Sequence, residues 1–271
     1  MNRCNDAASA NMRLRMHVPK IHLRGAPFRA LVLTLALLCV QTAFAVDLSR
    51  LWPIAGAGAA VKEVRNVGHF RAVRLSTDAR VIVRQGKHDS VVVEAESNVL
   101  PLVETYVEDG TLVVEDARHF KSPNAAVVIT VRRISSIGTT GTVAVTAEGL
   151  NVPTLSLSMG GSSALSLKAV SVGKLRAALG GSSALKVSGV ADDLSAELGG
   201  SSALRATELA ARSVSVNGGG SAQAVVWATE SLSISLSGSA GVSYFGIATP
   251  TLATSGAAMV KYLGTAPPTQ Q

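Results

Sequence analysis

From Ile137 onward, short runs of alternating apolar and polar residues recur at a nearly constant interval. Each run ends at a pair of small residues and is followed by a second apolar run, as in "LGGSSALKVSG" from Leu179. Alternation with a period of two is the pattern of a β-strand that buries one face. Because no unit holds a helical pattern of ten or more residues, each unit is predicted to be a strand, a corner, a second strand and a second turn.

The second glycine of the "GGSSAL" motif defines the register of this repeat. Its equivalents recur every 18 to 20 residues: Gly141, Gly161, Gly181, Gly200, Gly220, Gly238 and Gly256. Five of these glycines are followed by serine: Ser162, Ser182, Ser201, Ser221 and Ser239. A repeat of about 20 residues, built of short strands with glycine at the corners, is typical of one coil of a parallel β-helix.

We therefore predict an all-β protein in which residues 137–264 form a parallel β-helix of about seven coils. Glycine would turn one corner of each coil. The serines would form a column that hydrogen-bonds from coil to coil or to the turn backbone. Apolar residues such as Leu185 and Val187 would fill the lumen, and each coil would bury its core only against its neighbours.

The preceding residues, 67–136, read as strands without an obvious repeat. Alternating or β-branched runs predict strands at residues 70–75, 79–85, 90–96 and 125–131. Asp109–Gly110 lies between two apolar runs and predicts a hairpin turn with positive φ. This region either continues the β-helix or caps it. Residues 46–66 form a lead-in segment and residues 265–271 a polar tail.

The N-terminus carries the pattern of a secretory signal peptide. Arg24 and Arg29 precede the ten-residue apolar run "LVLTLALLCV", which is too short to span a bilayer, and Ala43 and Ala45 supply small residues for cleavage. We expect cleavage after Ala45 and a periplasmic or extracellular location. The alternative is a membrane anchor. Translation from Met12 or Met16 also remains open.

Removal of residues 1–45 changes the charge and the cysteine chemistry. The whole chain has 25 basic and 18 acidic residues and a formal charge of +7. The remainder has 19 basic and 17 acidic residues and a charge of +2, so the basic balance does not indicate nucleic-acid binding. Both cysteines, Cys4 and Cys39, are also removed, and the predicted mature chain has no disulfide.

The segment from Val67 to Asp116, followed by coils of the form "L-x-L-x-G-G-S", resembles the head GIN domain family of autotransporter adhesins. The resemblance covers about residues 67–264. It implies a right-handed parallel β-helix in the bacterial envelope or outside the cell, and it carries over no catalytic residue.

An enzyme that cleaves polysaccharides would need clustered carboxylates with basic residues on one face. The repeats hold six carboxylates: Glu148, Asp192, Asp193, Glu197, Glu208 and Glu230. Only the two aspartates are adjacent, in a turn where solvation explains them. We predict no catalytic residue, and we keep as the alternative a carbohydrate-active enzyme with a site around Arg132, Arg133 and Glu148.

No metal or cofactor is predicted. The glycine-rich turns carry Ser and Ala rather than the aspartates of calcium-binding β-rolls. The three histidines beyond residue 45, His69, His88 and His119, show no metal-ligand spacing.

Aromatic residues indicate one candidate contact surface. Trp227 and Phe245 occupy a column that is polar in three other coils, so both are expected to face outward as neighbours. They would form a platform for a glycan or an envelope protein. The alternative is an aromatic cap over the last coils. The column of small hydroxyl residues also leaves open an ice-binding surface. The sequence thus favours a non-enzymatic, adhesin-like binding or scaffold protein whose ligand and oligomeric state it does not identify.

Overall fold

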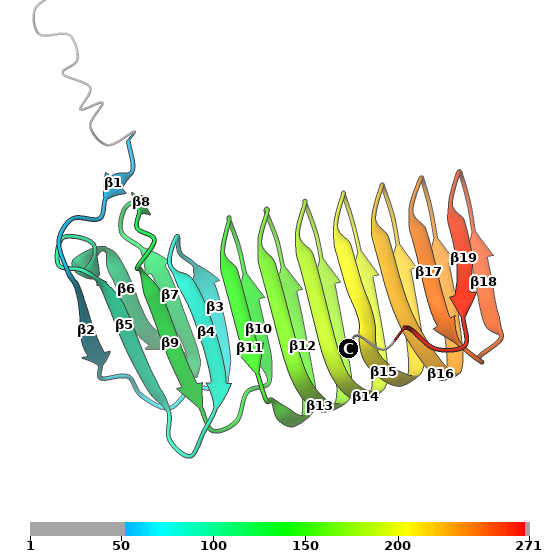
Figure 1. Ribbon diagram of the computed structural model, residues 1–271, viewed down its shortest axis with the longest axis horizontal. Helices are drawn as coiled ribbons and strands as arrows, with labels where there is room; N and C mark the ends of the chain where they lie inside the picture. The colour runs from blue at the N-terminus through cyan, green and yellow to red at the C-terminus, as the bar shows by residue number, and fades with distance from the viewer. Residues whose placement is uncertain (1–51, 269–271) are drawn as a thin grey trace, which may run out of the picture. The chain divides into compact units, whose positions relative to one another are not determined.

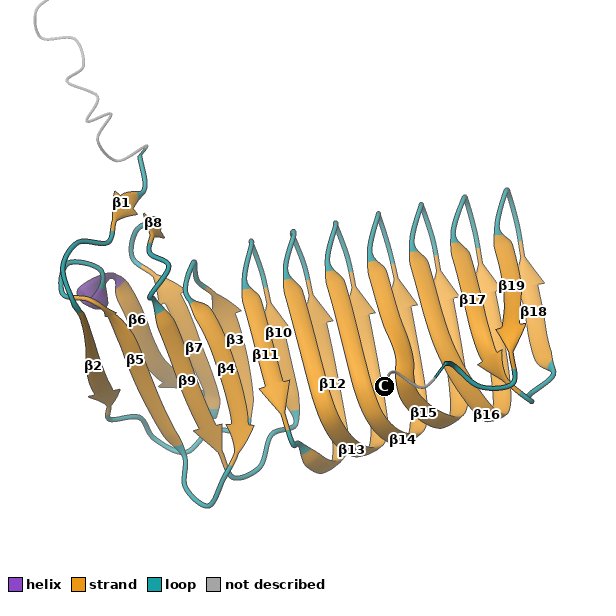
Figure 2. Ribbon diagram, in the orientation of Figure 1, coloured by secondary structure: helices purple, strands orange, loops and turns teal. Residues whose placement is uncertain are grey.

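The computed structural model describes residues 52–268, so the predicted signal peptide lies outside the described residues. The described chain is all-β, apart from a single 3-10 turn at Leu100–Leu102 (Figure 2).

From residue 136 onward the strands wind into a stack of coils (Figure 1). These strands are β10 (Ser136–Thr139), β11 (Ala144–Glu148), β12 (Asn151–Met159), β13 (Ala164–Leu179), β14 (Ala184–Leu198), β15 (Ala203–Gly218), β16 (Gln223–Leu236), β17 (Gly241–Gly246), β18 (Pro250–Thr254) and β19 (Met259–Gly264). Every pairing between these coils is parallel, and Leu175, for example, pairs with Leu155 and with Leu194. The predicted parallel β-helix is confirmed. It has about six turns, because seven glycine corners bound six complete coils.

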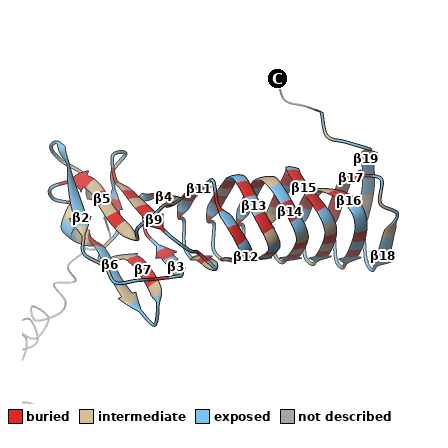
Figure 3. Cartoon of the chain, turned by 90° about the horizontal axis from the view of Figure 1, so that it is seen from below, coloured by how far each residue is buried: buried red, intermediate tan, exposed pale blue. Residues whose placement is uncertain are grey.

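Buried apolar residues form one continuous core along the stack, and Figure 3 shows buried and exposed positions alternating along the strands. In β13 the buried residues are Leu165, Leu167, Val170, Val172, Leu175, Ala177 and Leu179. Successive buried residues are two positions apart in each straight run and three positions apart where the strand bends. The alternation of buried and exposed residues therefore shifts by one position at each bend. Full burial of one such leucine contributes about 1.5–3 kcal/mol relative to exposure.

The seven corner glycines all have left-handed backbone, with φ between 67° and 78°. The next residue of each later coil donates its backbone N–H to the corner carbonyl of the coil before; Ser182 N–H, for example, donates to Gly161 O at 2.8 Å. The side chain of Ser182 is exposed, as are those of Ser162, Ser201, Ser221 and Ser239. The coils are therefore joined at these corners through the backbone.

The N-terminal strands both extend the β-helix and close its end. These strands are β1 (Ile54–Ala55), β2 (Ala60–Arg65), β3 (Ala72–Ser76), β4 (Arg80–Gln85), β5 (Ser90–Glu96), β6 (Val103–Glu108), β7 (Thr111–Asp116), β8 (Phe120–Lys121) and β9 (Ala126–Val131). Strands β3 and β4 lie between β7 and β9 on one side and β10 and β11 on the other, all in parallel pairs. Beyond them β6 pairs antiparallel with β7, β5 with β9, and β2 with β5. We call these antiparallel strands, β2, β5 and β6, the cap.

The corner between β3 and β4 uses hydrogen bonds in place of glycine. Asp116 accepts from Thr77 Oγ1 and from the N–H of Asp78, each at 2.6 Å. Burial raises the pKa of this carboxyl above its ordinary value, against the opposing effect of these two bonds.

Two carboxylates tie β5 of the cap to the segments on either side of β9 and make the cap sensitive to acid. Glu96 accepts from Ser122 Oγ at 2.6 Å and from Asn124 Nδ2 at 3.0 Å, and the bond from Ser122 leads the causes that lower the pKa of Glu96. Burial of Asp89 would raise the pKa of that carboxyl, but bonds from the Arg132 N–H and His69 lower it overall.

We expect the cap to open before the coils at acid pH. A carboxyl whose pKa is lowered by folding stabilises the fold above its unfolded pKa, and this contribution is lost as pH falls through the folded pKa, here below about pH 4. Hydrogen exchange in β5 and β9 should accelerate there while β13 to β16 stay protected. The pKa of Asp116 is raised by folding, so its protonation at low pH favours the folded state and opposes this loss of stability. Equal acceleration of exchange in the cap and in the coils would contradict the role given to Glu96 and Asp89. The Glu96→Gln variant should lose part of the pH dependence.

Candidate functional site

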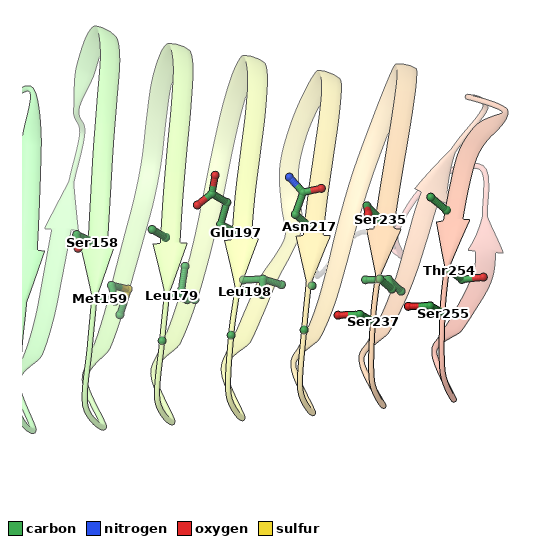
Figure 4. A pocket seen from close by; sticks show the side chains of 17 residues that line it. Ser158, Met159, Leu179, Glu197, Leu198, Asn217, Ser235, Ser237, Thr254 and Ser255 are labelled. Carbon is green, nitrogen blue, oxygen red and sulfur yellow. The ribbon is translucent and has the colours of Figure 1, made fainter.

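A long, shallow groove runs across the outer surface of the coils (Figure 4). It has a volume of about 890 Å³. Its outer row takes one residue from each of six coils: Ser158, Ala178, Glu197, Asn217, Ser235 and Ala253. Figure 4 shows Ser237 and Ser255 in a second row beside it. Six coils at the spacing of adjacent strands extend about 24 Å.

In three coils the floor of the groove is made by the first glycine of the pair, Gly180, Gly199 and Gly219, and in the last two coils Ser237 and Ser255 take that position. A Cβ on Gly199 would meet only Leu179 O, at 3.8 Å, which is an ordinary contact distance. A Cβ on the next residue, Gly200, would lie 2.7 Å from Gly181 O, and Gly200 also has φ of 69°. The two glycines therefore act differently: the second permits the corner, whereas the first leaves space outside the coil.

The groove is lined about equally by polar and apolar surface and is almost without charge. Its only ionisable side chain among the lining residues is Glu197, which pairs in the ladder with Asn217. The other polar groups are hydroxyls of Ser158, Ser235, Ser237, Thr254 and Ser255. Amide and hydroxyl groups both donate and accept hydrogen bonds, and a carboxylate only accepts. Because acid–base hydrolysis of a glycosidic bond uses two carboxyl groups, this lining suits binding better than cleavage.

The structure places Trp227 and Phe245 next to each other, paired in register on β16 and β17. Phe245 is only 9% exposed although it lies outside the continuous core, and Trp227 is half-buried. The pair thus offers part of one ring to solvent. Tyr244, on the same strand as Phe245, pairs with Tyr262 of β19; their ring centroids are 5.3 Å apart, and Tyr262 remains 51% exposed.

We expect Trp227→Ala to lower the free energy of unfolding by about 1–2 kcal/mol, because a half-buried ring is lost and Phe245 is uncovered. Tryptophan fluorescence should then come from Trp52, which is 76% exposed and open to quenchers. Chemical denaturation and acrylamide quenching measure both effects. Unchanged stability together with lost ligand binding would show instead that this patch is a contact surface.

The one carboxylate of the alternative enzyme site, Glu148, is separated from its two arginines. Arg132 and Arg133 line a pocket between the cap and the first coil, whereas Glu148 lies outside that lining. Glu148 contacts Lys168 Nζ at 3.5 Å and Arg84 Nε at 4.0 Å. These ion pairs lie on an outer face of the coils, so Glu148 does not join the two arginines in one site.

The adjacent aspartates are also accounted for by surface ion pairs. Asp193 lies 3.9 Å from Lys174 Nζ, and Asp192 lies 3.8 Å from Arg212, which also pairs with Glu230 at 2.9 Å. Pairs this exposed stabilise little.

Two of the three histidines beyond residue 45 each contact an aspartate. His69 Nδ1 lies 2.8 Å from Asp89 and His119 Nδ1 lies 3.0 Å from Asp78. Within residues 52–268 no three His, Cys, Asp or Glu side chains gather as a metal site. In the same range no helix is long and apolar enough to cross a membrane.

The fold and surfaces described above define a capped β-solenoid protein with a grooved outer face. A family model described as "Putative auto-transporter adhesin, head GIN domain" matches residues 69–248, well over half of the chain. The chain belongs to this family. A search of curated proteins found no match.

Solved structures of low sequence identity share the fold. A "putative adhesin" from Bacteroides fragilis has a TM-score of 0.72 at 21% identity, over 78% of this chain and 100% of that one. A "putative lipid binding protein" from Parabacteroides distasonis has a TM-score of 0.66 at 18% identity, over 78% and 100%. A "putative adhesin" from Parabacteroides merdae has a TM-score of 0.61 at 15% identity, over 78% and 98%.

Proposed function

We propose that this protein is a non-enzymatic binding protein of the bacterial envelope, and that its groove holds an extended, uncharged glycan. The observation that carries the proposal is the groove itself, which takes one outward-facing residue from each of six coils and has glycine on its floor in three of them. A surface that repeats at the strand spacing suits a polymer, since successive units of the ligand meet successive coils. The family description as an adhesin is consistent with a surface role.

Charge favours a neutral polymer. Glu197 is the one ionisable side chain in the lining, and a carboxylate repels an acidic polysaccharide while it accepts hydrogen bonds from sugar hydroxyls. Asn217 beside it adds an amide that donates and accepts. The predicted signal peptide, with cleavage after Ala45, would deliver the protein to the periplasm or the cell exterior, where such polymers occur.

A glycan array tests the proposal. The purified protein should bind neutral linear polysaccharides in preference to short or acidic ones, and it should release no reducing ends from them. The Glu197→Gln variant should keep binding to neutral chains, whereas Asn217→Ala should weaken it by about tenfold, the effect of one lost hydrogen bond of average to high strength. Binding only to acidic glycans, or release of reducing ends, would refute the proposal.

A further inference from the structure

A second pocket lies where the cap meets the first coils, away from the residues of the groove. Its volume is about 740 Å³, within the range of small-molecule sites. Four segments far apart in sequence build it: the chain before β3, the turn before β5, the β6–β7 hairpin and the loop between β9 and β10. Their ionisable residues are His69, Arg71, Asp89, Asp109, Arg132 and Arg133.

Asp89 contacts two side chains of the pocket, those of Arg132 and His69. Its side chain is 6% exposed. One carboxylate oxygen accepts the Arg132 N–H at 2.8 Å, and the other lies 2.8 Å from His69 Nδ1 and 3.8 Å from Arg132 Nε. These protein groups satisfy the buried carboxylate, so Asp89 positions Arg132 and His69 rather than offering a free negative charge.

The backbone of a second arginine of the pocket, Arg71, is also held in place. Arg71 donates its N–H to Gly110 O at 2.9 Å. Its carbonyl accepts the N–H of Ser135 at 2.8 Å and the Ser135 hydroxyl at 3.0 Å. The Arg71 backbone is thereby held between the hairpin and the loop that carries Arg133. Among the described residues, neither Arg71 nor Arg133 is within 4.0 Å of a carboxylate oxygen.

The pocket carries more positive than negative charge. Three arginines face two aspartates, and Asp89 is already satisfied by His69 and Arg132. Arginine presents a planar set of donors that matches the oxygens of phosphate and carboxylate groups. We propose that this pocket binds an oxyanion, a phosphate or carboxylate borne by a molecule of sugar or headgroup size, with Arg71 and Arg133 as its direct ligands.

The test titrates the purified full-length protein with glucose 6-phosphate, followed by NMR. Glucuronate, inorganic phosphate and glucose are parallel probes, and vesicles that contain phosphatidylglycerol present the same oxyanion on a lipid. The Arg71→Gln/Arg133→Gln double variant removes both proposed ligands. Arg176→Gln is the matched control, because Arg176 is an exposed arginine on β13 outside the pocket.

We expect saturable binding of glucose 6-phosphate or of the vesicles, no binding of glucose, and at least about tenfold weaker binding by the double variant. Arg176→Gln should bind as the wild type does, and both variants should keep their melting temperature. Tighter binding of glucose 6-phosphate than of vesicles would identify the ligand as an anionic sugar, and tighter binding of vesicles would identify it as an anionic lipid. Equal binding of glucose, an equal loss in Arg176→Gln, or no saturation by any anion would overturn the proposal. Loss of groove binding is a separate result, because the groove and this pocket share no residue.

Discussion

Replacing Gly181 by alanine should lower the free energy of unfolding by about 2–5 kcal/mol, from left-handed backbone and overpacking together. Gly181 has φ of 67°, where an L-residue costs about 1–2 kcal/mol. A Cβ there would also lie 2.5 Å from Gly161 O in the coil before. Since coils are joined at this point by the Ser182 N–H, relief of the clash must lengthen a ladder bond.

Gly141→Ala is the control that isolates the steric part. Its φ is 78°, similar to that of Gly181, but a Cβ on Gly141 would meet nothing within 4 Å. This variant should therefore lose only about 1–2 kcal/mol. Urea denaturation measures both. If both variants lose the same free energy of unfolding, the close approach of one corner to the next does not contribute to the cost of a Cβ at Gly181.

Replacing Gly199 by tryptophan should abolish binding in the groove while the fold persists. The new side chain would stand on the groove floor, where the only neighbour of its Cβ is Leu179 O at 3.8 Å. We expect at least about a hundredfold loss of affinity for a groove ligand, because the indole takes the ligand's place. Circular dichroism should be unchanged and the melting temperature close to that of the wild type.

Two matched variants sharpen this result. Gly200→Trp puts the same side chain one residue later, on a left-handed corner whose Cβ would lie 2.7 Å from Gly181 O, and it should unfold the protein. Ser182→Trp puts it on an exposed corner outside the groove lining and should leave binding intact. If Gly199→Trp binds glycan as the wild type does, the groove is not the site.

The repeat made the coils predictable because its signals are local. Positive φ favours glycine at Gly161 and its equivalents, and inward alternation shows directly in runs such as Leu175–Leu179. The pairing of Trp227 with Phe245 can be predicted from the spacing of the repeat. The burial of Phe245 cannot be predicted in this way, because it depends on neighbours from adjacent coils.

The order of the N-terminal strands could not be read from the chain. Strand β3 pairs with β10, some 60 residues later, and β7 lies on its other side. Such pairings depend on long-range packing, whereas the strands themselves and the turn at Asp109–Gly110 were visible in local alternation and turn residues.

The pocket beside the cap and the groove on the coils could be predicted from the sequence to different extents. Arg132 and Arg133 are adjacent in the sequence, but His69, Arg71 and Asp89 come from two other segments and join them only on folding. The groove could not be predicted, because it is marked only by the absence of a side chain at the first glycine of a "GG" pair. In the sequence the two glycines of a pair are equivalent, and only the space around each in the fold distinguishes them.

The central claim is that a repeating groove binds a linear neutral polymer. Its most direct test is calorimetric titration of the protein with a series of neutral oligosaccharides of increasing length. The account predicts that affinity rises with each added unit until the ligand spans about 24 Å, the length of six stacked coils, and is constant beyond that. Affinity that is independent of length from the disaccharide onward would contradict it.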